Sequence, residues 1–477
     1  MAGWEYHRAT AYFRSKLGGG WWERGDMPSV FKTYPGLPSV FLPRDIVFPS
    51  LTMEELLTQK TASGSSSRLT SFSLNTLSSF LFLSYGVTLV LRDERFFFRT
   101  VPSAGALYPA ELYIAVCGIP ELRPGIYHYN AGRHSLTEIA RLDESRNSST
   151  TLQAFVSGIF YRSSSKYRDR AFRYVLFDCG HLLEQVFLAG QAVGFCLACG
   201  TSSNATHQKI LSWEDILAVD PQHEIVLGTV TFENSPDYSA IEYNADPEHI
   251  KACSKVAHRA PVPPPVLDVA KATSGCVVEI CRETRSDKVG NVPDGRKLLD
   301  MPFATATLSR RSRRNYLIRS LQSDAVMSFV MALEDLILSG DDFRIFFIME
   351  RCGESFTNGI YKLTSGANGA RLVLLKEGAF LRYVAHAALD QTWLGDAVIH
   401  VIMAARLRDA EKHSGPGAYR KLLIHAGRIG QRVYLVSESL GLGCCGVGAF
   451  YDAELRNILE LSDDWDVLYL LGVGLIN

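Results

Sequence analysis

Two long segments of the chain share one pattern of apolar positions. Residues 171–200 (AFRYVLFDCGHLLEQVFLAGQAVGFCLACG) align with residues 418–448 (AYRKLLIHAGRIGQRVYLVSESLGLGCCGVG) at a constant offset of 247 residues. In both segments apolar residues recur at spacings of three and four for about five turns, and a glycine-rich stretch follows. Each half of the chain is therefore predicted to contain one long buried helix and its exit loop.

Shorter apolar runs predict paired strands that also occur twice. The runs ELYIAV (111–116) and GIYHY (125–129) have counterparts in FRIFFIM (343–349) and GIYKL (359–363), with 234 residues between the two GIY sequences. Because this offset differs from 247, the copies have diverged by insertion and deletion. Strands grouped with long helices, without strict alternation, favour an α+β fold built from two tandem units of about 180 residues each.

The domain organisation follows from these repeats and from one proline run. Residues 260–266 read APVPPPV, which cannot lie inside a helix or a central strand. We therefore expect an N-terminal region over 1–50, a first domain over 51–235, a connector over 236–300 and a second domain over 301–477.

Composition narrows the classes of function. The 477 residues are 47% hydrophobic and 21% charged, and 49 Lys and Arg balance 50 Asp and Glu, for a net charge of −1. This balance provides no global attraction to nucleic acid or anionic lipid, and favours a small-molecule or peptide substrate. No apolar run approaches the ~18 residues of a membrane helix, and no signal peptide is visible, so a cytoplasmic location is expected.

The ten cysteines predict neither a metal site nor disulfides. Cys196 and Cys199 lack the second pair that a four-ligand zinc site needs, and Cys444 and Cys445 are adjacent. A redox role for Cys196 and Cys199 is the alternative to two small core cysteines beside a glycine turn, which is the favoured interpretation. We expect reduced thiols and no bound metal.

The first candidate site is the sequence RTVPSAGALYP (99–109), between two predicted strands. Pro102, Ser103 and Gly105 would form a turn whose backbone amides and hydroxyl can closely approach a planar heteroaromatic ligand, because glycine has no side chain to obstruct it. An ordinary proline–glycine turn remains the alternative.

The second candidate is RRSRR (310–314), which precedes a stretch with helical spacing. Arg310, Ser312 and Arg314 would suit a phosphate group, since guanidinium offers paired donors to its oxygens. A solvated basic cluster is the alternative. Two further residues are interpreted as structural: His181 as a helix-end or core histidine, and Trp393, with Gln391, as part of a helix over ALDQTWLGDAVIHVIM.

Together these motifs resemble the SagB-type dehydrogenases of the nitroreductase superfamily. The resemblance rests on PSAGALYP after an arginine, GIYHY, KYRDRAFRY, and D-x-G-H on the long helix. RRSRRNY and the glycine loop at 441–448 resemble two other signatures of the superfamily, and YH…T, FKTYP and FLP resemble the family's leader region. The family includes flavin-dependent oxidases that convert thiazolines and oxazolines in peptides to thiazoles and oxazoles.

The resemblance implies an FMN site between two nitroreductase-like domains. In that family the serine–glycine loop comes from one subunit and the arginine motif from the other, so here a single chain would form a pseudo-dimer. The cofactor-binding residues carried over are Pro102, Ser103, Gly105, Arg310, Ser312, Arg314, Gly441 and Gly443. Expected partners are a peptide or small-molecule substrate and other enzymes of the same biosynthetic route.

Each half lacks the motif that the other half keeps. Where the first half should carry its arginine motif it reads SGSSSR (63–68), with Arg68 as its one cation. Where the second half should carry its serine–glycine loop it reads LSGDDF (338–343). The sequence therefore predicts one good FMN site per chain and an empty or weak site at the opposite seam.

Lys166 and Tyr167 stand where the family carries its lysine–tyrosine motif, implicated in catalysis. Desaturating an azoline requires loss of a proton and a hydride, and an adjacent ammonium would lower the pKa of Tyr167 enough to make it a base. Adjacent residues of a strand face opposite ways, so cooperation requires a loop or a helix end here. The structural alternative is a surface lysine beside a packed tyrosine.

The sequence leaves three functions open. The leading one is an FMN-dependent dehydrogenase or oxidase that desaturates an azoline to an azole on a peptide or small-molecule intermediate in natural-product biosynthesis. The second is an NAD(P)H-dependent reductase of nitro or enone compounds, as elsewhere in the superfamily. The third is a non-catalytic scaffold with a vestigial flavin site.

Overall fold

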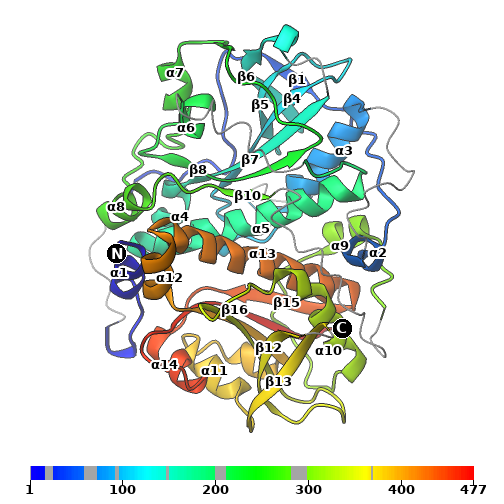
Figure 1. Cartoon of the computed structure of the whole chain (residues 1–477), viewed down its shortest axis with the longest axis vertical. Coiled ribbons are helices and arrows are strands. Elements are labelled where there is room, and N and C mark those ends of the chain that lie inside the picture. Colours follow the sequence, from blue (N-terminus) through cyan, green and yellow to red (C-terminus); the bar gives the residue numbers. More distant parts are fainter. Residues whose placement is uncertain are drawn as a thin grey trace.

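Two long helices lie between two β-sheets at opposite ends of the molecule (Figure 1). The computed structural model describes residues 2–16, 25–58, 72–91, 96–146, 150–198, 211–280, 298–366 and 369–477. The central helices are α5 (Ala171–Ala192) and α13 (Gly417–Ser439). They are the two helices predicted from the repeated apolar pattern, and the mixed α+β class is confirmed.

The first sheet occupies the upper end in Figure 1. Its strands, in spatial order, are β1 (Ser39–Phe41), β6 (Ser135–Leu142), β5 (Gly125–Asn130), β4 (Ala110–Cys117), β7 (Thr151–Ile159), β8 (Glu224–Phe232) and β10 (Val278–Ile280), and β9 (Ile241–Tyr243) pairs with β6. Neighbours are antiparallel except that β10 is parallel to β8. Every residue of β4, β7 and β8 is buried, because both faces of the sheet are covered.

The second sheet repeats much of this order. Its strands are β13 (Gly369–Glu377), β12 (Gly359–Gly366), β11 (Phe343–Met349), β14 (Ile399–Ala405), β16 (Asp466–Leu475) and β15 (Leu442–Val447). The order β6-β5-β4-β7-β8 of the first sheet thus matches β13-β12-β11-β14-β16 of the second. The predicted strand pairs at 111–129 and 343–363 are confirmed as β4–β5 and β11–β12.

Shorter elements cover the sheets and join them. A separate hairpin consists of β2 (Val87–Val90) and β3 (Phe97–Arg99). The other helices are α1 (Ala2–Ala9), α2 (Met53–Thr58), α3 (Leu74–Tyr85), α4 (Phe160–Tyr167), α6 (Trp213–Ile216), α7 (Pro247–Ala252), α8 (Pro264–Ala272), α9 (Phe303–Ser309), α10 (Ser323–Leu333), α11 (Leu381–Ala387), α12 (Leu407–Ser414) and α14 (Asp452–Ile458). Within the described ranges, no helix has the length and apolarity needed to cross a membrane.

The region from 236 to 300 contributes ordered structure to the first half. Its described part forms β9, α7, α8 and β10, and Ile250 is fully buried in the core on the outer face of the first sheet. The proline run caps and begins α8, with Pro263 at the N-cap and prolines in the first turn, where a helix tolerates them.

The helix predicted over ALDQTWLGDAVIHVIM is wrong. A single turn of 3-10 helix spans Thr392–Asp396, and the following apolar run is strand β14, paired with β11 and β16. A short, fully buried apolar run has no alternation, so its periodicity cannot distinguish a central strand from a buried helix.

The N-terminal region contacts both halves. Its first residues pack on the second half, where the backbone N–H groups of Gly3 and Trp4 donate to the Glu411 carboxylate at 2.9 and 3.1 Å. Further along, the fully buried Lys32 ammonium pairs with Glu224 on β8 of the first half. This region therefore fastens the halves to each other.

Helices α5 and α13 cross where a glycine of one faces a glycine of the other. A Cβ on Gly180 would lie 2.2 Å from the Ile424 carbonyl oxygen and 2.9 Å from the Cα of Gly427. A Cβ on Gly427 would lie 2.3 Å from the Phe177 carbonyl oxygen and 3.0 Å from the Cα of Gly180. Gly180 and Gly427 correspond under the 247-residue offset, so the crossing is symmetric. Only glycine, which has no Cβ, allows the two backbones to approach this closely.

Gly180→Ala should therefore lower the free energy of unfolding by about 3 kcal/mol or more, despite the higher helix propensity of alanine. The added methyl group meets backbone, which cannot rotate away. Urea denaturation checks this. Gly190→Ala, on the same helix, is the matched control, because its Cβ would meet the Phe232 ring, a side chain that can shift. Equal losses for the two variants would show that the crossing is not unusually tight.

Candidate functional site

A pocket lies between the two halves, on one side of the α5–α13 pair. Residues of the first half that line it are Pro102, Ser103, Ala104, Gly105, Tyr167, Tyr174, Phe177, Asp178 and His181. Residues of the second half that line it are Ser312, Arg314, Gln391, Tyr434, Cys445, Gly446, Val447, Gly448, Ala449 and Tyr469. Neither half alone forms this pocket.

The loop before β4 forms one wall, and its backbone is unusual. Gly105 has a φ of 66°, and two residues with side chains, Ala106 and Tyr108, also have positive φ values of 55° and 46°. Such conformations cost of order 1–3 kcal/mol each and persist only where surrounding contacts hold them. Pro102, Ser103 and Gly105 thus lie on the pocket wall as the sequence indicated.

The Ser103 hydroxyl is engaged within the protein. It donates to Asp178 Oδ2 at 2.5 Å and accepts the Tyr108 backbone N–H at 2.8 Å, while the Ala104 N–H donates to the same carboxylate at 3.3 Å. A hydroxyl has one hydrogen to donate. The loop can therefore offer backbone amides to a ligand, while the Ser103 hydrogen serves the loop itself.

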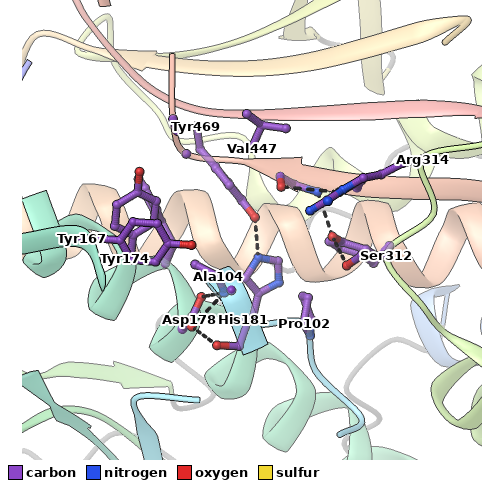
Figure 2. A pocket seen from close by; sticks show the side chains of 18 of the residues that line it. Pro102, Ala104, Tyr167, Tyr174, Asp178, His181, Ser312, Arg314, Val447 and Tyr469 are labelled. Carbon is purple, nitrogen blue, oxygen red and sulfur yellow. Dashed lines mark hydrogen bonds between the residues drawn. The ribbon is translucent and has the colours of Figure 1, made fainter. Parts of the chain in front are cut away.

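Helix α5 supplies the floor of the pocket through residues on one face. Tyr174, Phe177, Asp178 and His181 follow the spacing of three and four residues that aligns side chains along a helix. Figure 2 shows Tyr174, Asp178 and His181. Burial raises the Asp178 pKa to about 7, although Ser103 and the Ala104 N–H oppose the shift by donating to the carboxylate. Burial therefore moves the titration of Asp178 from the acid range toward neutral pH.

His181 lies in the pocket wall as a neutral imidazole. Burial lowers its pKa to about 3, and one ring nitrogen is hydrogen-bonded to Gln431 Oε1 at 3.1 Å. The other is hydrogen-bonded to the Tyr469 hydroxyl at 3.1 Å (Figure 2). These contacts join α5 to α13 and β16. The core interpretation of His181 accounts for its burial, and the structure adds that it lines the pocket.

Lys166 and Tyr167 end helix α4, so the pair does lie at a helix end. Tyr167 lines the pocket with its ring stacked on Tyr174, 4.1 Å between centroids (Figure 2). Lys166 is exposed, with its ammonium 5.4 Å from the Tyr167 ring. Burial, and then the Asp178 carboxylate, raise the pKa of Tyr167 above its usual value. The expectation that Lys166 lowers this pKa is wrong, because desolvation disfavours the phenolate more than the exposed ammonium favours it.

The residues of the arginine motif lie in different places relative to the pocket. Ser312 forms an isolated β-bridge with Cys444 of β15, and Ser312 and Arg314 line the pocket while Arg311 and Arg313 do not. Arg314 is exposed to the pocket, with its guanidinium 5.6 Å from the Trp393 ring. The structure thus places two of the three predicted residues at the pocket.

Arg310 lies outside the pocket lining. Its guanidinium is buried and donates to the backbone carbonyls of Thr100 and Arg99, each at 2.9 Å. A residue of the second half therefore fixes the start of the loop from the first half. This role depends on contacts between distant segments, which the sequence pattern could not indicate.

Gly441 and Gly443 are also outside the pocket lining. Gly441 follows the end of α13 with a φ of 70°, and a Cβ on Gly443 would meet Ile476 and Arg313, neither of which lines the pocket. The part of the glycine-rich loop that lines the pocket is Cys445–Ala449. The pocket-lining residues of this loop therefore lie a few positions after the two glycines predicted from the sequence.

Several lining residues were not singled out as candidates. Asp178 was noted only as part of D-x-G-H, while Tyr434 and Tyr469 carried no sequence signal. Tyr434 accepts the Gly446 N–H at 2.7 Å and is hydrogen-bonded to Ser312 at 2.9 Å, so it ties the arginine segment to the glycine-rich loop. Gln391, read from the sequence as part of a structural helix, precedes the 3-10 turn and lines the pocket.

The corresponding positions on the other side of the helix pair hold paired polar groups. Under the 247-residue offset, Asp178, His181 and Gln431 correspond to His425, Arg428 and Glu184. His425 Nε2 donates to the Leu336 carbonyl at 2.8 Å, and Arg428 donates to Glu184 at 2.9 Å. Arg432 also pairs with Glu184, and with Asp335 at 3.0 Å. Arg68, the one cation expected on this side, lies outside the described residues.

Arg310→Ala should reduce the free energy of unfolding by about 3 kcal/mol, because two charge-assisted hydrogen bonds to buried carbonyls are lost at ~1.5–3 kcal/mol each. Arg314→Ala, a change to an exposed side chain of the same motif, should stay within about 0.5 kcal/mol. Urea denaturation without added ligand measures both. Similar losses for the two variants would contradict the division between a structural and a pocket-facing arginine.

Comparisons with known proteins agree with this architecture. Residues 349–475 match the nitroreductase family model. Over 134 residues the chain is 38% identical to a Methanocaldococcus jannaschii protein named as a nitroreductase, a match that covers 25% of this chain and 64% of that protein. It is 30% identical over 145 residues to the trifolitoxin-processing protein TfxB of Rhizobium leguminosarum bv. trifolii, covering 26% of this chain and 36% of that protein. Both alignments span less than two thirds of the relative's length.

One solved structure extends the likeness to the whole chain. A protein from Anabaena variabilis, also named as a nitroreductase, superposes with a TM-score of 0.69 over 100% of this chain and 99% of its own, at 24% sequence identity. This likeness concerns the fold. The C-terminal part of the chain thus matches the nitroreductase family model, and the fold of the whole chain is similar to that of the Anabaena protein.

Proposed function

We propose that this protein is an FMN-dependent dehydrogenase or oxidase of the SagB type, which desaturates an azoline to an azole on a peptide or small-molecule intermediate. The observation that carries the proposal is a single pocket lined by the loop 102–105 from one half and by Ser312 and Arg314 from the other. Two tandem-duplicated nitroreductase-like halves would form this arrangement within one chain. The likeness to a protein named for trifolitoxin processing supports a peptide substrate.

The residues present fit FMN. Arg314 and the Ser312 hydroxyl could hold a phosphate, since they project from one extended segment into the pocket. The backbones of Gly105 and Gly446 allow a planar ring to approach closely. The Tyr174 hydroxyl is buried with no hydrogen-bond partner among the described residues. A buried hydroxyl without a partner destabilises the fold, unless a bound ligand supplies the missing hydrogen bond. When bound, FMN supplies a two-electron acceptor.

The chain's own groups would then orient the substrate. The raised pKa of Tyr167 keeps its phenol protonated at neutral pH, so it can donate a hydrogen bond to a heteroatom of the substrate. Its stacking on Tyr174 fixes the ring, and Lys166 beside it can bind a carboxylate or carbonyl oxygen at the pocket edge. We therefore retain Lys166 and Tyr167 as the proposed catalytic pair, with Tyr167 acting as a donor and not as a phenolate base.

The purified protein should contain one FMN per chain, because within the described residues only one seam combines the loop with the arginine segment. Arg314→Ala should weaken FMN binding roughly tenfold to a hundredfold, as expected for the loss of one charge-assisted bond of ~1.5–3 kcal/mol. Visible absorbance of the isolated protein and fluorescence titration of the apoprotein measure stoichiometry and affinity.

Arg313→Ala is the matched control, since the adjacent arginine does not line the pocket. It should retain FMN. Two FMN per chain would refute the single-site assignment. Absence of bound flavin, together with no thermal stabilisation by added FMN, would instead favour the non-catalytic scaffold, because a ligand that binds the native state must stabilise it.

Tyr167→Phe should keep FMN content and folding, since the ring still stacks on Tyr174, while turnover of an azoline substrate falls ~10²–10⁴-fold, the range for a positioned proton-transfer or donor group. Lys166→Ala should have a smaller effect, because the ammonium is exposed. Steady-state kinetics with flavin quantified in each variant measure this. Wild-type turnover by Tyr167→Phe would remove the pair from the mechanism.

The second candidate is an NAD(P)H-dependent reductase of nitro or enone compounds. It is favoured by the 38% identity to the M. jannaschii protein named as a nitroreductase. Anaerobic mixing of the flavin-loaded protein with NADPH separates the two functions. Rapid bleaching of the flavin absorbance would support the reductase, while slow or absent bleaching, with reduction by an azoline substrate, would support the dehydrogenase.

A further inference from the structure

Asp178 is a buried carboxyl on the pocket floor that the lysine–tyrosine mechanism does not use. Its residue is 5% exposed, and it lies one helical turn beyond Tyr174, whose hydroxyl has no partner among the described residues. A buried carboxyl without a cation paired to it is uncommon, because desolvation disfavours its charged form. Such a group at a pocket wall calls for a functional explanation.

We propose that Asp178 is the residue that accepts the substrate's proton at this site, and that its ionisation is coupled to the loop 102–105 through Ser103. This inference rests on the proposed function, because it concerns the same pocket. It assigns proton removal to Asp178 and leaves substrate orientation to Lys166 and Tyr167.

The hydrogen bonds around Asp178 leave it capacity to take up a proton. The Ser103 hydroxyl donates to Oδ2, and the Ala104 N–H lies 3.3 Å from both oxygens. A carboxylate offers about four acceptor positions, so two donors do not saturate it. Both donors belong to the loop with positive φ values at Gly105 and Ala106. The carboxylate therefore also helps hold the strained loop in place.

No other residue lining the pocket titrates near neutral pH. Burial raises the pKa of Tyr434, Tyr469 and Cys445, and it lowers that of His181 to about 3. The titratable groups that interact electrostatically with Asp178 are Tyr108, Tyr167, Cys179 and Tyr469. His181 and Arg314 line the same pocket, and Arg310 lies outside its lining. The tyrosines, the thiol and the imidazole are all neutral at pH 7, and neither arginine forms an ion pair with Asp178 among the described contacts. Burial raises the pKa of Asp178 itself to about 7, where a base works best.

The proton and electron balance requires such a base. Desaturation breaks two C–H bonds of the azoline and forms one π bond. One hydrogen leaves as hydride to the two-electron acceptor, which is FMN in the proposed function. The other leaves as a proton, which becomes the O–H of the Asp178 carboxylic acid. Tyr167 cannot take that proton, because its phenol already holds one.

The opposite side of the helix pair lacks this group. The position that corresponds to Asp178 is His425, whose pKa burial lowers to about 4 and whose Nε2 donates to the Leu336 carbonyl. Leu336 lies in the segment before β11, as Ser103 lies in the segment before β4. On both sides the residue at this helix position is thus hydrogen-bonded to the segment that precedes the corresponding strand. Asp178 is a carboxyl that can accept a proton near neutral pH, whereas His425 is not.

The test is a pH titration of the visible spectrum of FMN bound to the full-length protein. A carboxyl ionising beside the flavin should shift the spectrum with a midpoint near pH 7, and Asp178→Asn should abolish the shift while retaining FMN. Ser103→Ala removes a donor to the ionised form, so the midpoint should rise by about one pH unit. His425→Gln, which keeps an N–H for Leu336, is the matched control and should leave the midpoint unchanged.

Activity adds an independent readout. With an azoline substrate, kcat/KM should rise with pH through the same midpoint, because the base must be deprotonated, and Asp178→Asn should lose ~10²–10⁴-fold. A bound flavin whose spectrum and pH–rate profile are the same in wild type and Asp178→Asn would overturn the inference. A protein that binds no FMN would overturn the proposed function instead, so the two failures are distinguishable.

Discussion

The close approach of α5 and α13 at Gly180 and Gly427 is the constraint on which the arrangement of the two halves depends. Each helix packs against the sheet of its own half, so the distance between the helices sets the distance between the sheets. Any side chain at either glycine would push the halves apart. The pocket lies across this seam, and its opposing walls remain within reach of one ligand only if the crossing stays tight.

Because the crossing is symmetric, the fold provides two equivalent seams, and the side chains decide how each is used. On one side His181 and Gln431 form a neutral hydrogen bond beside an open pocket. On the other side Arg428 and Glu184, at the corresponding positions, form an ion pair extended by Arg432 and Asp335. Because these charged groups are paired with one another, they are not available to a ligand.

Burial tunes the chemistry of the pocket more than any charged neighbour does. It keeps Tyr167 protonated, His181 neutral and Asp178 near its midpoint at neutral pH. The same desolvation acts in opposite directions on acids and bases, since it always disfavours the charged form. Three residues that line one pocket thus acquire distinct protonation states.

The sequence by itself determined the features that depend on local pattern. The apolar periodicity located α5 and α13, the GIY runs located two strand pairs, and the repeat indicated two related halves. The turn at Pro102–Gly105 was found because proline and glycine restrict the backbone locally. Tertiary structure decided the rest: that Arg310 holds the loop while Arg314 faces the pocket, that Gly446 lines it while Gly443 does not, and that the run before Ala405 is a strand. Tertiary structure also decided the ionisation of Asp178 and Tyr167. Desolvation depends on which distant segments cover a group, and the local sequence does not indicate which segments these are.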